Sequence, residues 1–403
     1  MAEIEINDIL RAAVKAGASD IHIKVGSPPA FRVNGTLIFI KGAPRITRED
    51  ANNMVLSMMS PLQRERLDKY NEVDLAYTSS ESERDLNSNV GYGIPGLTRF
   101  RVNIYRQRGT LALAIRPIPY DILDFHDLNL PLVLEKIAQE ERGLVLVTGT
   151  TGSGKSTTLA AIIDYINSTR SCHIITIEDP LEYLHRDKRA FISQREVGVD
   201  TLSFANALRV ALREDPDIIL VGEMRDLESI EIAVAAAETG HLVLSTLHTL
   251  DAQETISRIL AVFPPNQQNQ IRYQLSHVLK AIISQRLMPR ADGKGRVPAA
   301  EVLIATSRVK ELISDPARTK EIRIAIEEGN LYYGMQTFDQ CLFDLYKKGL
   351  ITYDEAMRQA TNKDDLALKI SGVTSGADAR AAEIDRLGKE KLKKTEELEI
   401  RRS

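Results

Sequence analysis

The chain contains 403 residues, of which 43% are hydrophobic and 27% are charged, as in an average soluble globular protein. This length allows two or three domains, and the composition excludes a mainly disordered chain. Lys and Arg number 52 and Asp and Glu number 56, so the formal charge of −4 does not favour a nucleic-acid-binding protein. The two cysteines, Cys172 and Cys341, form no CxxC pair, which excludes a disulfide scaffold and a four-cysteine zinc site.

The sequence shows no sign of membrane insertion. No run of 18 consecutive apolar residues is present, and the first residues lack the basic and apolar regions of a signal peptide. We therefore expect a cytoplasmic protein that reaches a membrane only through a partner.

The first part of the chain has the pattern of a small α/β domain. Apolar residues at helical spacing predict a helix over 4–16, and alternating residues predict a strand over 20–25. Asn34-Gly35 suits a type I′ turn and predicts a hairpin over 31–40. The elements expected next are a helix over 48–69, strands over 73–77, 98–105 and 111–116, a polar loop over 78–96, and a connector over 120–131.

From residue 132 onward, short apolar runs alternate with amphipathic helices. The apolar runs are 144–148, 173–177, 218–221 and 242–246. Fully apolar strands separated by helices indicate a parallel sheet that is covered on both faces. We expect a doubly wound α/β core, followed by helices from about 266 to 371. For the charged tail over 373–403, a marginal helix or disorder is expected.

A phosphate-binding pattern follows the first apolar run. The residues Gly149-Thr150-Thr151-Gly152-Ser153-Gly154-Lys155-Ser156 fit G-x-x-x-x-G-K-[ST]. The glycines let backbone N–H groups turn toward phosphates, and the N-terminus of the following helix adds favourable partial charge. We expect Lys155 to hold the β- and γ-phosphates and the Ser156 hydroxyl to bind Mg²⁺. This segment, extended by Thr157, predicts an ATP site.

Carboxylates follow two of the other apolar runs. Residues 218–221 lead to Gly222 and Glu223, where an aspartate that binds Mg²⁺ commonly takes the place of the glycine. We expect Glu223 to act at the Mg²⁺ or at its water. Acids also follow the run 173–177, and spacing alone does not say which of them polarises water: Glu178, Asp179 and Glu182.

Two histidines and two arginines complete the candidates. His241 and His248 flank the run 242–246, and both belong to a strand next to the expected γ-phosphate. The sequence leaves open whether each of them is structural or catalytic. Arg101 and Arg116 are expected to project from one sheet face, where they either clamp a γ-phosphate or remain solvated charges.

Four segments together resemble the type II/IV secretion ATPase superfamily. They match its Walker A, Asp box, Walker B and His box in the family's order, at 149–156, 175–182, 220–223 and 240–248. Segments 18–22 and 99–103 resemble its N-terminal domain. Within the superfamily, the chain is most similar to the type IV pilus retraction motors, the PilT/PilU group. It lacks the four-cysteine zinc insertion of extension motors, and Gly334–Gln340 resembles a C-terminal segment of retraction ATPases.

The resemblance implies a PAS-like N-terminal α/β domain over 1–119 and a RecA-like P-loop ATPase core with a parallel sheet over 132–372. It implies that Glu182 is the catalytic glutamate, that Glu223 and His248 are the Walker B and His-box residues, and that Arg101 and Arg116 reach the γ-phosphate. It further implies a homo-hexamer in which ATP-driven closure of the two domains acts on an inner-membrane pilus platform protein. The motor would then lie at the cytoplasmic side of the inner membrane and bind no nucleic acid.

One segment departs from the pattern of the principal retraction ATPases. They carry an Ala-Ile-Arg-Ala-Gly-Arg-Asp-like motif, and this chain reads Ala325-Ile326-Glu327-Glu328-Gly329-Asn330 in its place. Acids in place of arginines favour the accessory, PilU-like branch, with a paralogous pilus ATPase as a candidate partner. A pilus extension or secretion motor of the same superfamily is the alternative.

Two functions of other classes fit the sequence less well than a motor. A RecA-like nucleic-acid translocase needs a basic face with aromatic residues for stacking, and the chain has 5% aromatic residues and no Trp. A regulator that binds ATP without hydrolysing it does not need Lys155, Ser156, Glu182 and Glu223 together.

Overall fold

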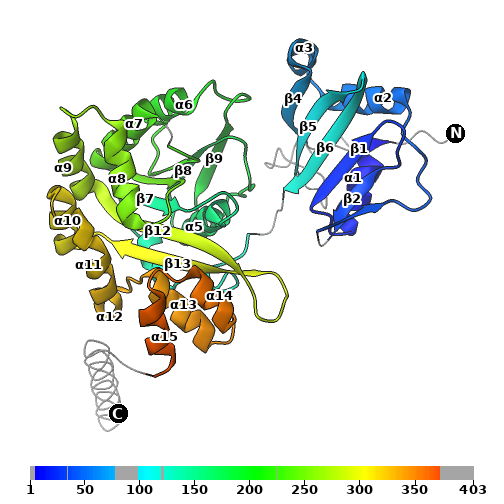
Figure 1. The fold of residues 1–403 in the computed structure, drawn as a ribbon. Helices are drawn as coiled ribbons and strands as arrows, with labels where there is room; N and C mark the ends of the chain where they lie inside the picture. The colour runs from blue at the N-terminus through cyan, green and yellow to red at the C-terminus, as the bar shows by residue number, and fades with distance from the viewer. Residues whose placement is uncertain (1–4, 34, 78–98, 119–121, 225, 373–403) are drawn as a thin grey trace, which may run out of the picture. The chain divides into compact units, whose positions relative to one another are not determined.

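The computed structural model describes residues 5–33, 35–77, 99–118, 122–224 and 226–372. The chain divides into two compact units, which are treated separately below (Figure 1). The N-terminal unit comprises Met1–Ile122 with Pro180–Arg186, and the C-terminal unit comprises Leu123–Asp179 with Asp187–Ser403. Asn34 of the expected hairpin turn, the expected loop over 78–96 and the charged tail lie outside the described residues.

The N-terminal unit is built on a six-stranded antiparallel sheet in the order β3-β2-β1-β6-β5-β4. Its strands are β1 (Asp20–Lys24), β2 (Ala30–Val33), β3 (Thr36–Phe39), β4 (Glu72–Tyr77), β5 (Arg99–Gln107) and β6 (Thr110–Ile118). Alternate residues such as Ile21, Val102 and Ile115 are buried in a core with side chains from helices α1 (Ile6–Lys15), α2 (Arg48–Met58) and α3 (Pro61–Tyr70). The strands that the sequence predicted in this region are confirmed.

The helical stretch expected over 48–69 consists of two helices, α2 and α3, with a break between them that the sequence analysis did not predict. Met59 between them is extended, with φ −106° and ψ 138°. Ser60 then caps α3 in a reciprocal capping box with Gln63. The residue before a proline is disfavoured in helical conformation, so Pro61 accounts for the break and for the new start.

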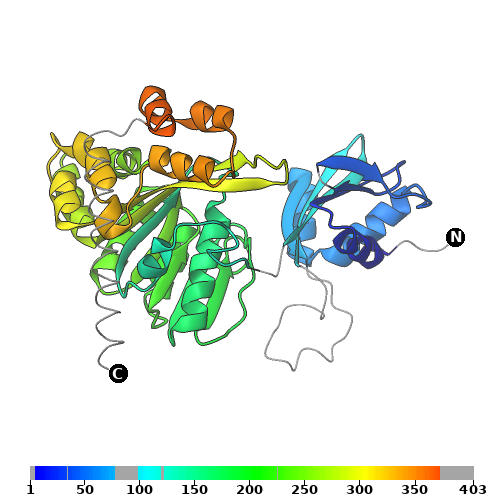
Figure 2. The same cartoon turned by 90° about the horizontal axis from the view of Figure 1, so that it is seen from below.

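The C-terminal unit contains a seven-stranded sheet in the order β13-β12-β7-β11-β10-β8-β9 (Figures 1 and 2). Its strands are β7 (Gly143–Thr148), β8 (His173–Glu178), β9 (Phe191–Glu196), β10 (Ile218–Val221), β11 (Leu242–Leu247), β12 (Leu279–Pro289) and β13 (Arg296–Ile304). All neighbours are parallel except β12 and β13. The prediction of an α/β core with a parallel sheet is confirmed.

The expectation that only helices follow residue 266 is wrong, because β12 and β13 form a hairpin that extends the sheet. β9 was not predicted either. The apolar run at the start of β12 suits a buried helix as well as a buried strand, and periodicity does not separate the two.

Helices cover both faces of this sheet. Leu144 and Leu146 of β7 belong to one core cluster, and Val145 and Val147 belong to the other. The helices are α4 (Val133–Ala138), α5 (Lys155–Thr169), α6 (Phe204–Ala211), α7 (Leu227–Glu238), α8 (Ala252–Val262), α9 (Gln268–Val278), α10 (Ser307–Ser314), α11 (Ile322–Glu328), α12 (Asn330–Tyr333), α13 (Phe338–Lys347), α14 (Tyr353–Gln359) and α15 (Lys363–Ile370). The last three form a separate cluster with the hairpin end of β12 and β13 (Figure 1). None of the helices in the described ranges has the length and apolar content that crossing a bilayer requires.

Candidate active site

The expected phosphate loop joins the buried strand β7 to helix α5, which begins at Lys155. Gly149, Gly152 and Gly154 all have positive φ, a conformation that glycine adopts without steric cost. A Cβ atom on Gly149 would lie 2.4 Å from the backbone oxygen of Gln285 and 2.5 Å from Ser153 Oγ. Glycine is therefore required at this position by space as well as by backbone conformation.

Lys155 lies inside this loop. Its Nζ donates hydrogen bonds to the carbonyl oxygens of Gly149, at 2.9 Å, and Thr150, at 3.1 Å, and the residue is 9% exposed. Ser153 Oγ is buried and has no hydrogen-bond partner among the described residues. Ser156 and Thr157 are half-buried in the first turn of the 15-residue helix α5. A buried ammonium, an unpaired hydroxyl and a helix N-terminus fit the phosphates of a nucleotide.

Glu223 and His248 meet at the same edge of the sheet as the loop. β7, β11 and β10 are parallel neighbours, so their carboxyl ends lie together, and Leu247 is directly opposite Thr148. Glu223 follows β10, roughly 10 Å from β7 at the usual strand spacing. Its Oε2 lies 3.5 Å from His248 Nε2. The structure therefore brings together the two residues that the sequence placed on different motifs.

The glycine that replaces the usual aspartate after β10 has a structural reason. The Gly222 N–H donates to the Ile177 carbonyl oxygen at 2.8 Å. A Cβ on Gly222 would lie 3.2 Å from that oxygen and 3.4 Å from Glu178 Cα. β8 and the end of β10 approach too closely for an aspartate without displacement, which leaves the carboxylate to Glu223.

The three acids at and after the end of β8 differ in their surroundings. Glu178 Oε1 accepts hydrogen bonds from Thr176 Oγ1 at 2.8 Å and from Gln194 Nε2 at 3.4 Å, so neighbouring strand residues hold this carboxylate. Asp179 and Glu182 are exposed. Glu182 belongs to the segment Pro180–Arg186, which groups with the N-terminal unit.

His241 lies at the opposite edge of the sheet. It precedes β11, whereas the phosphate loop follows β7, and a six-residue strand spans roughly 20 Å. Its Nδ1 lies 2.9 Å from the carbonyl oxygen of Ala236. Of the two interpretations that the sequence left open for His241, its place at the amino end of β11 favours the structural one.

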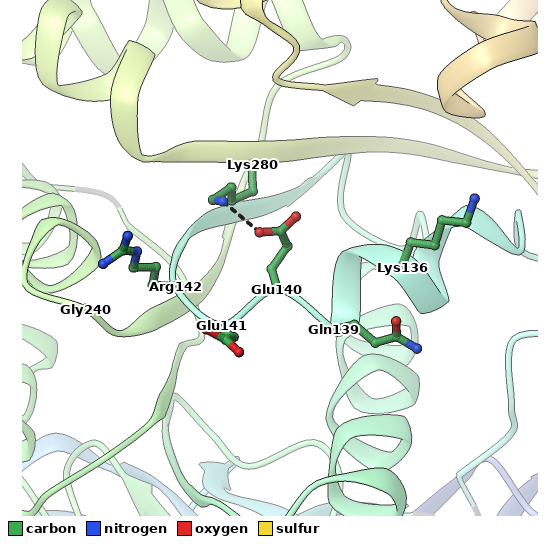
Figure 3. A pocket seen from close by; sticks show the side chains of 7 residues that line it. All are labelled: Lys136, Gln139, Glu140, Glu141, Arg142, Gly240 and Lys280. Atoms are coloured by element: carbon green, nitrogen blue, oxygen red, sulfur yellow. Dashed lines mark hydrogen bonds and ion pairs between the residues drawn. The ribbon is translucent and has the colours of Figure 1, made fainter.

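A pocket of about 680 Å³ opens at this amino edge (Figure 3). It is lined by Lys136, Gln139, Glu140, Glu141, Arg142, Gly240 and Lys280. Lys280 Nζ donates to Glu140 Oε2 at 2.7 Å across it. Because the pocket lies at the amino ends of β7 and β11, it is separate from the phosphate loop.

Arg101 and Arg116 are exposed and directly opposite each other on β5 and β6. The expectation that they project from one face is confirmed, since directly paired residues share a face. Arg116 Nε and Nη2 donate to Asp20 Oδ1 at 3.0 and 2.7 Å. Burial acts to raise the pKa of Asp20, but the hydrogen bonds from Arg116 and Ser19 outweigh it and hold that pKa below its ordinary value.

Residues of β12 that the sequence analysis missed also border the phosphate loop. Ser284 Oγ accepts a hydrogen bond from Thr148 Oγ1 at 2.9 Å, and both residues are fully buried. The Gln285 backbone oxygen faces Gly149, and its Oε1 is buried without a partner in the described parts of the chain. The sequence signal that could have identified these residues is the apolar run at the start of β12, which ends in the polar residues Ser284 and Gln285 much as β7 ends in Thr148.

Comparison with known proteins gives the family. A family model described as "Type II/IV secretion system protein" matches residues 113–364. The chain belongs to this family. Two relatives in Pseudomonas aeruginosa are the type IV pilus retraction ATPase PilT, 43% identical over 89% of this chain and 98% of that protein, and the type IV pilus ATPase PilU, 40% identical over 93% and 94%. The crystal structure of the pilus retraction motor PilT with bound ADP superimposes with a TM-score of 0.80 and 47% identity, covering 91% and 99% of the two chains.

The family resemblance inferred from the four motifs is thus confirmed, and the chain is a nucleotide-binding, PilT-type ATPase. The C-terminal segment Gly334–Gln340, which resembles retraction ATPases, has structural roles. Thr337 and Gln340 form a capping box at the start of α13, and Gln336 pairs with Val302 of β13. The two acids of the segment 325–330 are paired within the C-terminal unit, Glu327 with Lys369 at 3.4 Å and Glu328 with Arg308.

Proposed function

We propose that this PilT-type ATPase hydrolyses ATP at the loop 149–156 and thereby powers type IV pilus retraction and twitching motility. The observation that carries this function is the 43% identity to PilT over 89% of the chain. The geometry supports ATP hydrolysis, because a buried lysine, a helix N-terminus and a carboxylate–histidine pair lie together at one edge of the sheet.

The C-terminal unit provides the groups that hold ATP. Lys155 and the backbone N–H groups of the loop bind the β- and γ-phosphates, with Thr157 in the same helical turn. Mg²⁺, when bound, neutralises phosphate charge, and the Ser156 hydroxyl with Glu223 (through a water) would hold it. His248 orients the Glu223 carboxylate, to which it is already adjacent.

Other charged residues complete the reaction. Glu182 accepts the proton of the attacking water, and Arg101 and Arg116 balance the charge that develops on the γ-phosphate. The pairing of Arg116 with Asp20 supports this role, since it fixes the guanidinium direction before ATP arrives.

The motor is a homo-hexamer in which ATP closes an N-terminal domain over 1–119 onto a core over 132–372, through a connector over 120–131. This motion acts on a pilus platform protein, so the ring works at the cytoplasmic side of the inner membrane. Residues 373–403 form a tail that is dispensable for ATP hydrolysis.

Three variants test the chemistry. Lys155→Ala should abolish ATP hydrolysis, while Lys188→Ala, which removes a surface lysine paired with Asp164, should retain it. Glu182→Gln should lose turnover and keep its affinity for ATP, because the amide cannot accept the proton. ATP hydrolysis by the Lys155→Ala protein at the wild-type rate would refute the proposed site.

A second candidate is an accessory, PilU-like retraction ATPase, favoured by Glu327 and Glu328 and by the 40% identity to PilU over 93% of the chain. Counting surface pili and twitching in a strain that lacks the gene separates the two. Excess pili with lost motility would show a principal retraction motor. Near-normal pili with a motility defect would show the accessory branch, and few or no pili would show an extension motor.

A further inference from the structure

Glu301 of β13 is a buried carboxylate with no place in the mechanism above. It is 6% exposed, and it sits on the strand that the sequence analysis assigned to helix. Carboxylates are seldom buried unless they are paired or hydrogen-bonded, so its partners indicate what it does.

Strand pairing connects Glu301 to the phosphate loop. Glu301 is directly opposite Ser284 of β12, and Ser284 is directly opposite Thr148 of β7. The Thr148 hydroxyl donates to Ser284 Oγ at 2.9 Å. Glu301 therefore stands in the same row of the sheet as the residue that immediately precedes Gly149.

The Glu301 side chain reaches the turn that carries His248. Its Oε1 accepts the N–H of Ala252, the first residue of α8, at 3.0 Å. The same turn is held at a second point, where the Thr249 and Thr255 hydroxyls lie 2.6 Å apart in a buried hydrogen bond. His248 lies between β11 and this fixed turn, so the position of its imidazole depends on both anchors.

We infer that Glu301 is a positioning residue for ATP hydrolysis: by holding the Ala252 N–H, it fixes the turn after His248 and sets the His248–Glu223 pair beside the phosphate loop. The inference rests on the proposed ATPase function. Glu301 acts through the turn and touches neither ATP nor the reacting atoms.

The charge of Glu301 affects the strength of this hold. Burial raises its pKa to about 7, and Asp251 adds to the rise, while the Ala252 N–H, Arg323 and Arg286 act in the opposite direction. An ionised acceptor makes a stronger hydrogen bond than a neutral one, and negative charge is favourable at a helix N-terminus. The turn is therefore held more firmly above pH 7 than below it.

The test compares the full-length wild type with Glu301→Gln, measuring kcat and KM for ATP between pH 6 and pH 8.5. The glutamine keeps an acceptor oxygen without the charge. We expect kcat at pH 8 to fall roughly tenfold, the difference between a charged and a neutral acceptor, with KM unchanged. In the wild type, kcat should rise as the pH passes 7, because Glu301 becomes ionised. In Glu301→Gln this rise should be smaller.

Two further variants complete the design. Glu355→Gln removes another buried carboxylate, which accepts a hydrogen bond within α14, and should leave kcat and its pH profile unchanged. Thr255→Val loosens the second anchor and should lower kcat while keeping the pH dependence, which tests the turn even if Glu301→Gln does not fold. A Glu301→Gln protein with wild-type kcat and pH profile would overturn the inference, as would an equal loss at every pH. Absence of ATP hydrolysis in the wild type would instead contradict the proposed function.

Discussion

Gly149→Ala tests the close packing between the phosphate loop and β12. Gly149 has φ +141°, a region that residues with side chains rarely adopt, and such strain costs about 1–3 kcal/mol. The added methyl would also lie 2.4 Å from the Gln285 backbone oxygen and 2.5 Å from Ser153 Oγ. Forcing a methyl group into such a site costs about 1–3 kcal/mol more. The structure therefore predicts a total loss of roughly 2–6 kcal/mol.

Gly240→Ala is the matched control, because Gly240 has φ +114° but no atom within 4 Å of an added Cβ. Gly240→Ala should lose only the free energy that comes from backbone strain at positive φ. At about 2–4 °C per kcal/mol, thermal unfolding should separate the two variants by roughly 2–12 °C.

The same pair of variants should differ in nucleotide binding. Gly149→Ala displaces either the loop or β12, so its affinity for ADP should fall by at least about tenfold, equivalent to 1.4 kcal/mol. Gly240→Ala, at the opposite edge of the sheet, should keep wild-type affinity. Equal thermal midpoints and equal affinities in the two variants would refute the packing argument.

Three further predictions follow from single contacts. Thr148→Val should destabilise the protein by about 1–3 kcal/mol in denaturant unfolding, because it removes the buried hydrogen bond to Ser284, and Thr148→Ser should restore most of the loss. The pKa of Glu301 rises from 4.5 to about 7 on folding, so the contribution of this group to stability is fully present below pH 4.5 and is lost as the pH rises to about 7. Thermal midpoints at pH 5 and 7.5 should therefore differ less in Glu301→Gln than in the wild type, and an identical difference would contradict the shift. Arg116→Ala should raise the pKa of Asp20 toward its ordinary value, which NMR titration of the carboxyl group measures.

The strands that frame the site could be predicted because each is a short apolar run buried on both faces. Val145 and Val147 pack on one side of β7, and Leu144 and Leu146 pack on the other, so the run carries no alternation. The run at the start of β12 has the same character, and its local pattern fits a buried helix equally well. Its place is set by pairing with β7, a contact between segments that are distant in the chain and that no local pattern encodes.

In the candidate site, too, features set by one local segment could be predicted, and features set by contacts between distant segments could not. The phosphate loop could be read residue by residue, because its chemistry depends on the order of residues within one segment. The sequence alone does not distinguish the two histidines of the His box. In the structure they lie at opposite ends of β11, and His248 is the one that lies beside Glu223. The buried partners Ser284 and Glu301 carry no sequence motif, and their roles become visible only from the strand register.

The place of β7 in the sheet has a consequence for how the protein is made. Both of its neighbours, β11 and β12, come later in the chain, and β11 begins roughly 90 residues after β7 ends. At a synthesis rate of about 5–20 residues per second, about 5–20 s pass between the synthesis of β7 (Gly143–Thr148) and the synthesis of β11, the first strand that can pair with it. During that time an uncharged, β-prone segment with unpaired backbone groups is exposed, which invites aggregation. New chains should therefore depend on chaperones until β11 is complete, and slower synthesis should lengthen that dependence.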